Sequence, residues 1–135
     1  MLLAGLLGLA APGQAGPGSP DKPVKWEYAE LTYRHYAGHR GGVTAAGTFF
    51  PDQPDTEVIR WVTAEGEVEA KGWADLAERL KAPAFKKEGS AAYQRVQVFN
   101  HLGRDGWELV EQTEATTPPP IGAPPKAWTF KRRVP

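Results

Sequence analysis

The stretch Phe99-Asn-His-Leu-Gly-Arg-Asp-Gly-Trp-Glu-Leu-Val110 predicts the end of a helix, a tight turn and the start of a strand. Gly103 stands where a left-handed residue often ends a helix, and glycine adopts that conformation without steric cost. Gly106 supplies a second permissive position, after which Trp107 begins an alternating strand. This corner is therefore expected to fix how helix and sheet meet, and the rest of the chain is expected to pack against it.

Two helices are predicted before this corner. The main helix covers about residues 91–102, with Ser90 as its N-cap, because serine accepts a hydrogen bond from a free amide of the first turn. Its predicted apolar stripe is Ala92, Val96 and Phe99. A shorter helix is predicted over about residues 73–81, where apolar residues recur at spacings of three and four. These residues are Trp73, Leu76, Ala77 and Leu80.

Strands are predicted where aromatic and β-branched residues alternate with polar ones. They cover residues 24–36, 57–63, 67–70, 107–113 and 127–132, and the last two form a hairpin across a proline-rich loop at 118–125. In the first strand, Trp26 and Tyr28 fall opposite Ala29, so either a bulge switches the faces or both faces are partly covered. These elements predict an α+β domain, in which an antiparallel sheet of three to five strands carries both helices on one face.

The N-terminal segment is expected to direct export. Residues 1–11 are apolar and uncharged, shorter than the roughly 20 residues of a membrane-spanning helix but suited to a signal peptide. Cleavage is expected after Ala15, although no basic residue precedes the apolar run. Residues 16–23 then form a flexible linker and 24–134 a single domain. The mature protein is therefore expected to be periplasmic or extracellular, without stable membrane insertion. If residues 1–15 are retained, the domain is cytoplasmic instead.

Four segments, in this order, resemble a known family. They are Lys25-Trp-Glu-Tyr28, Phe99-Asn-His-Leu-Gly103, Gly106-Trp-Glu-Leu-Val110 and Phe130-Lys-Arg132. Together they resemble the small bacterial domains grouped as domain of unknown function 4177. The resemblance covers about residues 24–36 and 90–133, and it implies a helix laid across an antiparallel sheet without assigned catalytic residues. Residues 38–72 have no counterpart in that family and read as an insertion.

The first half of this insertion, residues 38–54, is rich in glycine and proline. Such residues favour turns and irregular backbone, so a mobile loop is expected here. Thr48-Phe49-Phe50 is the one part of it expected to make apolar contacts, and the two phenylalanines are expected to fold back onto the core.

Charge and cysteine content narrow the classes of function. The chain has 16 lysines and arginines and 16 aspartates and glutamates, so its formal net charge is zero. Binding to nucleic acid depends largely on basic residues that neutralise phosphates, so no nucleic-acid partner is expected. The chain has no cysteine, which excludes disulfides, thiolate zinc sites and thiol nucleophiles.

No catalytic, cofactor or metal site is assigned from the sequence. His35 and His39 are weak metal candidates, because residues four apart share a face only on a helix and the glycines around them disfavour one. His101 is expected to favour the negative end of the helix dipole. Asp105 and Glu108 are interpreted as a turn residue and a solvent-facing strand residue, in preference to an acid–base pair.

The leading hypothesis is a non-enzymatic interaction or accessory module that offers an exposed sheet edge, expected at residues 126–134, to a protein partner. The alternative is a small-ligand or metal binder, or an enzyme, whose site lies in the insertion at 38–72. Its candidate residues are His35, His39, Arg40 and Arg60. Structural roles in the core or at turns are assigned to Trp26, Trp73, Phe99, Gly103, Gly106, Trp107 and Phe130.

Overall fold

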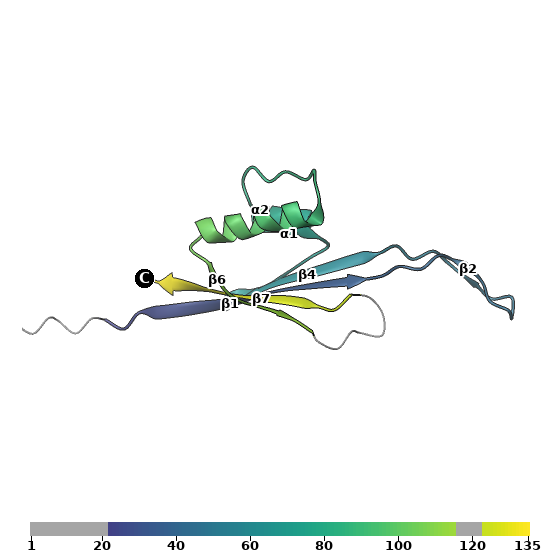
Figure 1. The fold of residues 1–135 in the computed structure, drawn as a ribbon, viewed down its shortest axis with the longest axis horizontal. Coiled ribbons are helices and arrows are strands. Elements are labelled where there is room, and N and C mark those ends of the chain that lie inside the picture. Colours follow the sequence, from purple (N-terminus) through teal and green to yellow (C-terminus); the bar gives the residue numbers. More distant parts are fainter. Residues whose placement is uncertain (1–21, 116–122) are drawn as a thin grey trace, which may run out of the picture.

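The computed structural model describes residues 22–115 and 123–135, and five of the strands within them form one antiparallel sheet in the order β5-β4-β1-β7-β6. The strands are β1 (Lys25–Tyr36), β4 (Thr56–Thr63), β5 (Gly66–Ala70), β6 (Glu108–Glu114) and β7 (Lys126–Val134). The helices α1 (Trp73–Arg79) and α2 (Ala91–Arg104) lie on one face, and no other described element covers the opposite face (Figure 1). The predicted α+β class is confirmed, as is the placement of both helices on one face.

The predicted signal peptide at residues 1–15 and nearly all of the predicted linker lie outside the described residues. The same holds for residues 116–122 of the proline-rich loop. In the part of the chain that the structure describes, no helix is long and apolar enough to cross a membrane.

Alternate residues of β1 point to opposite faces of the sheet, and these two faces differ in burial. Ala29 and Leu31 face the helices and are buried, whereas Trp26 and Tyr28 lie on the open face and are 40% and 60% exposed. The pairing of β1 with β4 and with β7 runs without a register shift, so the strand contains no bulge. Trp26 therefore lies outside the core, contrary to the role expected for it.

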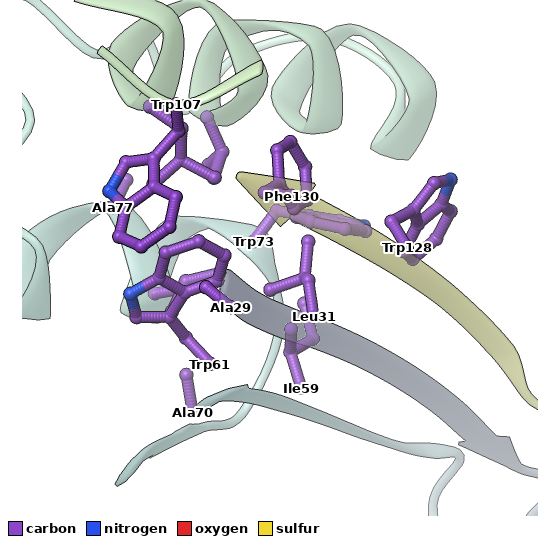
Figure 2. Packing of buried hydrophobic residues seen from close by; sticks show 13 residues of the cluster. Ala29, Leu31, Ile59, Trp61, Ala70, Trp73, Ala77, Trp107, Trp128 and Phe130 are labelled. Carbon is purple, nitrogen blue, oxygen red and sulfur yellow. The ribbon is translucent and has the colours of Figure 1, made fainter. Parts of the chain in front are cut away.

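Aromatic side chains dominate the core between the helices and the sheet. The other four tryptophans, Trp61, Trp73, Trp107 and Trp128, are all buried. Trp61 and Trp107 meet edge to face with ring centroids 5.3 Å apart, and Trp73 and Trp128 do so at 6.0 Å (Figure 2). Such pairs each stabilise by about 0.5–1.5 kcal/mol beyond the burial of their area. Phe130 is also buried, and Phe99 is partly buried against it, as their structural roles require.

Helix α2 begins as predicted but buries a different stripe. Ser90 Oγ accepts a hydrogen bond of 3.1 Å from the backbone amide of Tyr93, which confirms the N-cap. The fully buried residues are Val98, His101 and Leu102. Val96 is half exposed and Ala92 is exposed, so the stripe predicted from them was wrong. The buried face includes His101, and a histidine is not counted when the buried face of a helix is predicted from the spacing of its apolar residues.

The corner turns at Gly106 as predicted, but α2 ends later than predicted. Gly103 lies inside α2, and the helix continues to Arg104. Gly106 has φ of 88°, a left-handed conformation that glycine adopts freely. The amide of Trp107 then donates to Leu102 O at 3.0 Å, which ties the first residue after the turn to the helix. The prediction that Gly103 ends the helix in a left-handed conformation was therefore wrong, whereas the turn at Gly106 is confirmed.

The last strand, β7, lies inside the sheet between β1 and β6. The exposed edge predicted at residues 126–134 is therefore wrong, and the edge strands of the five-stranded sheet are β5 and β6. Strand β6 has a register shift between Leu109 and Glu111 and carries three glutamates along its length. Irregularity and charge of this kind discourage edge-to-edge pairing, so this edge is a poor docking strand.

Candidate functional site

Beyond the sheet, β1 and β4 continue as a hairpin of residues 37–55, here called the arm, which projects away from the helices (Figure 1). It contains β2 (Gly42–Val43) and β3 (Phe49–Phe50), which pair antiparallel. His39 and Gln53 exchange two backbone hydrogen bonds of 2.8 Å. The segment predicted as a loop is therefore a hydrogen-bonded hairpin.

Glycine and aspartate make this arm narrow. A Cβ atom on Gly38 would lie 2.0 Å from Gln53 O, and one on Gly41 would lie 2.7 Å from the backbone nitrogen of Asp52. The two glycine amides donate to aspartate side chains across the arm: Gly38 to Asp55 Oδ1 at 2.7 Å, and Gly41 to Asp52 Oδ1. The composition that is typical of a loop thus permits two backbones to approach closely.

The tip of the arm presents apolar side chains to solvent. Val43 and Phe49 are directly paired across β2 and β3, so their side chains share one face. They are 65% and 72% exposed, and Phe49 is the most exposed large apolar side chain in the described residues. The ring of Phe50 lies against His39, with ring centroids 5.8 Å apart. The expectation that both phenylalanines pack on the core was wrong, because the arm projects away from it.

The residues proposed for a site in the insertion have separate partners. His35 Nε2 lies 3.4 Å from Asp55 Oδ2, whereas His39 packs on Phe50. Arg60 Nε lies on the open face of the sheet, 3.4 Å from Glu67 and 3.0 Å from Glu69. Arg40 is exposed on the arm. Within residues 22–115 and 123–135, no three histidine, aspartate or glutamate side chains are grouped as metal ligands.

A polar hollow of about 560 Å³ lies at the base of the arm. It is lined by His35, Asp55, Thr56, Glu57 and Lys71. Beside it, Tyr33 Oη donates to Glu57 Oε1 at 2.9 Å. Burial, together with the hydrogen bond and the charge of Glu57, raises the pKa of Tyr33 to about 12. Tyr33 therefore stays protonated near neutral pH and acts as a hydrogen-bond donor, not as a base.

We expect Tyr33 to ionise only as the pH approaches about 12. Its pKa is raised in the folded state, so its contribution to stability is complete below the ordinary pKa of 10.0 and is lost as pH rises through about 12. In a pH titration, tyrosinate absorbance should show a transition near pH 12. Tyr33→Phe should remove this transition, and Glu57→Gln should shift it to lower pH. Tyr28→Phe is the matched control, and a late transition that survives Tyr33→Phe would contradict the assignment.

The two carboxylates near the corner do not form a pair. Asp105 Oδ2 lies 3.5 Å from His101 Nε2, whereas Glu108 Oε2 lies 4.0 Å from Lys131 Nζ. His101 is buried, and its Nε2 is 3.1 Å from the backbone oxygen of Leu80, so the ring links α2 to the end of α1. The structure thus gives His101 a hydrogen bond to another element, and the dipole interaction expected for it stays a prediction.

Comparison with known proteins adds no assignment, since no family model, curated protein or solved structure matches this chain. The geometry therefore carries the functional argument. Sequence reasoning missed the exposed arm tip, although one signal was present: no charged residue occurs from 41 to 51, and that run contains Phe49 and Phe50.

Proposed function

We propose that this chain is an exported, non-enzymatic interaction module that binds a protein partner through the tip of the arm. The observation that carries the proposal is the exposure of Val43 and Phe49, 65% and 72%, at the end of a projecting hairpin. Removing apolar surface from water stabilises by about 25 cal/mol per Å². An apolar pocket on another protein would therefore gain affinity by covering these two side chains.

The arm presents its tip in a fixed conformation. Backbone hydrogen bonds join its two sides at His39 and Gln53 and again at Thr44 and Thr48. The ring of Phe50 packs over Gly42, where an added Cβ would approach it to 3.2 Å, and so braces the opposite side of the tip. A preorganised element loses less conformational entropy on binding than a flexible loop does. This ordering supports a role in specific recognition.

The charges beside the tip favour a protein over a lipid surface. An anionic membrane attracts basic residues by about 1 kcal/mol each. Arg40 is the basic residue next to the uncharged run, and Asp52 and Asp55 lie across the arm from it. The negative charge of these two aspartates offsets the attraction between Arg40 and anionic lipids. A tip that inserts into a membrane would need that attraction.

The body of the domain serves as the scaffold in this proposal. The segments that resemble domain of unknown function 4177 build β1, α2, β6 and β7, whereas the arm belongs to the insertion. The interaction would therefore reside in the part that distinguishes this chain from that family.

A photo-crosslinking experiment tests the arm. Benzoylphenylalanine is placed at position 49, and, as a matched control, at position 96, where Val96 is half exposed on α2. In cells that make the protein, position 49 should give a discrete protein adduct that position 96 does not. Excess wild-type protein should compete the adduct away, and Phe49→Ser should compete at least about 30-fold less well, as for the loss of an anchor that contributes about 2 kcal/mol.

Two results would overturn the interaction proposal. One is the same set of adducts from both positions, and the other is crosslinking to lipid alone. Export is tested separately by mass spectrometry of the protein recovered from periplasmic and extracellular fractions. The mature N-terminus is expected at Gly16, and recovery only from the cytoplasm with Leu2 or Met1 retained would refute export.

A further inference from the structure

A pocket of about 400 Å³ opens at the end of the core where α2 meets the turn between β4 and β5. Its apolar wall includes Trp61 and Trp107, whose indoles lie together at one end of the core, away from Trp128 (Figure 2). The charged side chains on its rim are those of Glu65, Asp105 and Arg132; Glu67 also lines the pocket, but its carboxylate lies beside Arg60 on the open face of the sheet. A volume of this size falls within the range of about 300–1,000 Å³ typical of small-ligand sites.

The positive group on the rim is already neutralised. Arg132 Nε lies 2.7 Å from Glu27 Oε2, and its guanidinium carbon lies 4.5 Å from the ring centroid of Trp107. The carboxylates are less well matched. In the described part of the chain Glu65 forms no ion pair, and Asp105 lies 3.5 Å from His101 Nε2 but forms no ion pair with a lysine or arginine. The rim therefore has two carboxylates that no lysine or arginine neutralises.

The C-terminal end of α2 adds to this field. His101 and Leu102 from its last turn line the pocket together with the C-cap residue Asp105. The C-terminus of a helix carries a partial negative charge of roughly half an electron, which favours cations.

We propose that this pocket binds an organic cation: an ammonium or guanidinium group on a short hydrocarbon chain. The tryptophan wall would accept the hydrocarbon, and Glu65 and Asp105 would face the charge. Arg132 on Trp107 shows that an indole of this wall already holds a guanidinium. The ligand is either a free amine or guanidine, or the side chain of an arginine or lysine in a peptide. The inference does not depend on the arm.

The experiment follows the indole NH signals of the ¹⁵N-labelled full chain by NMR. N-acetylarginine amide carries one charge, and N-acetylcitrulline amide is its uncharged isostere. The arginine probe should shift the signals of Trp61 and Trp107 in a saturable way, whereas those of Trp26 and Trp128 should stay in place. The citrulline probe should leave the indole NH signals of these four tryptophans unchanged.

A double variant tests the carboxylates. Glu65→Gln with Asp105→Asn should weaken binding of the arginine probe at least tenfold, whereas Glu111→Gln on β6 should not change it. Thermal unfolding of each variant checks that the fold is kept, and 0.5 M salt should weaken wild-type binding independently of any substitution.

A peptide probe distinguishes the two sources of the cation. If Gly-Gly-Arg-Gly-Gly binds at least tenfold more tightly than N-acetylarginine amide, the natural ligand is a peptide side chain. Equal affinities indicate a free amine or guanidine, and both results support the cation site. Citrulline binding as tightly as arginine, or no shift of Trp61 and Trp107 with either charged probe, would overturn the proposal.

Discussion

Replacing Trp107 with alanine is expected to lower the free energy of unfolding by about 3–5 kcal/mol. The indole is 7% exposed, meets Trp61 edge to face at 5.3 Å, and lies beneath the guanidinium of Arg132. Its removal would leave a cavity at the corner and take away the ring on which Arg132 rests. Because a typical domain is stable by only about 5–15 kcal/mol, this loss should be evident in urea unfolding.

Trp26→Ala is the matched control for Trp107→Ala. Trp26 is 40% exposed on the open face, where its chief partner is Lys131 Nζ, 4.4 Å from the ring centroid. An exposed cation–π contact contributes about 0.5–1 kcal/mol, so the control should lose no more than about 1 kcal/mol. If Trp107→Ala fails to fold, Trp107→Phe keeps an aromatic ring and permits a measurement. Equal losses at positions 107 and 26 would contradict the placement of Trp107 in the core.

The parts of the fold that were predictable depend on local signals. Ser90 caps α2 as expected, because a cap is formed between residues three apart. The apolar spacing of α1 likewise placed Trp73, Leu76 and Ala77 in the core. Alternation in β1 placed Trp26 and Tyr28 opposite Ala29, but of the two arrangements predicted from it, a bulge or two partly covered faces, the structure shows neither.

The errors in the fold concern features that local sequence does not encode. Strand β7 was predicted at an edge of the sheet. It lies inside the sheet because β1, more than ninety residues earlier in the chain, pairs with it. The buried stripe of α2 was misplaced because His101 is buried with a hydrogen bond to Leu80 O, a partner 21 residues away. In both cases a distant segment decides what a residue contacts.

The candidate sites were harder to predict than the fold. The insertion was named only in the alternative hypothesis, in which histidines and arginines were expected to supply the chemistry, whereas the leading hypothesis placed the interaction at the sheet edge of residues 126–134. In the structure the exposed feature of the arm is its apolar tip. His35 lies beside Asp55, and His39 packs against Phe50. The pocket proposed for an organic cation is lined by residues of β4, of β7 and of the C-terminal end of α2. Only the folded chain therefore brings Trp61, Asp105 and Arg132 together.

Gly38→Ala is expected to open the arm while the body stays folded. The new methyl carbon would lie 2.0 Å from Gln53 O, 2.5 Å from the carbonyl carbon of Pro54 and 2.6 Å from the amide nitrogen of Asp55. All three are backbone atoms, so no side-chain rotation can relieve the overlap, and overpacking of this kind typically costs about 1–3 kcal/mol. The two sides of the arm must separate, which breaks the hydrogen bonds between His39 and Gln53.

Hydrogen exchange measures this effect residue by residue. The amides of His39 and Gln53 should lose protection in Gly38→Ala, whereas those of Leu31 and Trp61 in the paired central strands should keep it. Gly103→Ala makes the same chemical change inside α2, where nothing lies within 4 Å of the added carbon. That control should raise the free energy of unfolding by about 0.5–1 kcal/mol, because alanine loses less backbone entropy than glycine in a helix. Protection that persists at His39 and Gln53 in Gly38→Ala would show that the arm is not closed by these hydrogen bonds. A tip no longer held by them should also compete less well for the crosslinked partner, which connects the glycine of the arm to the function proposed for Phe49.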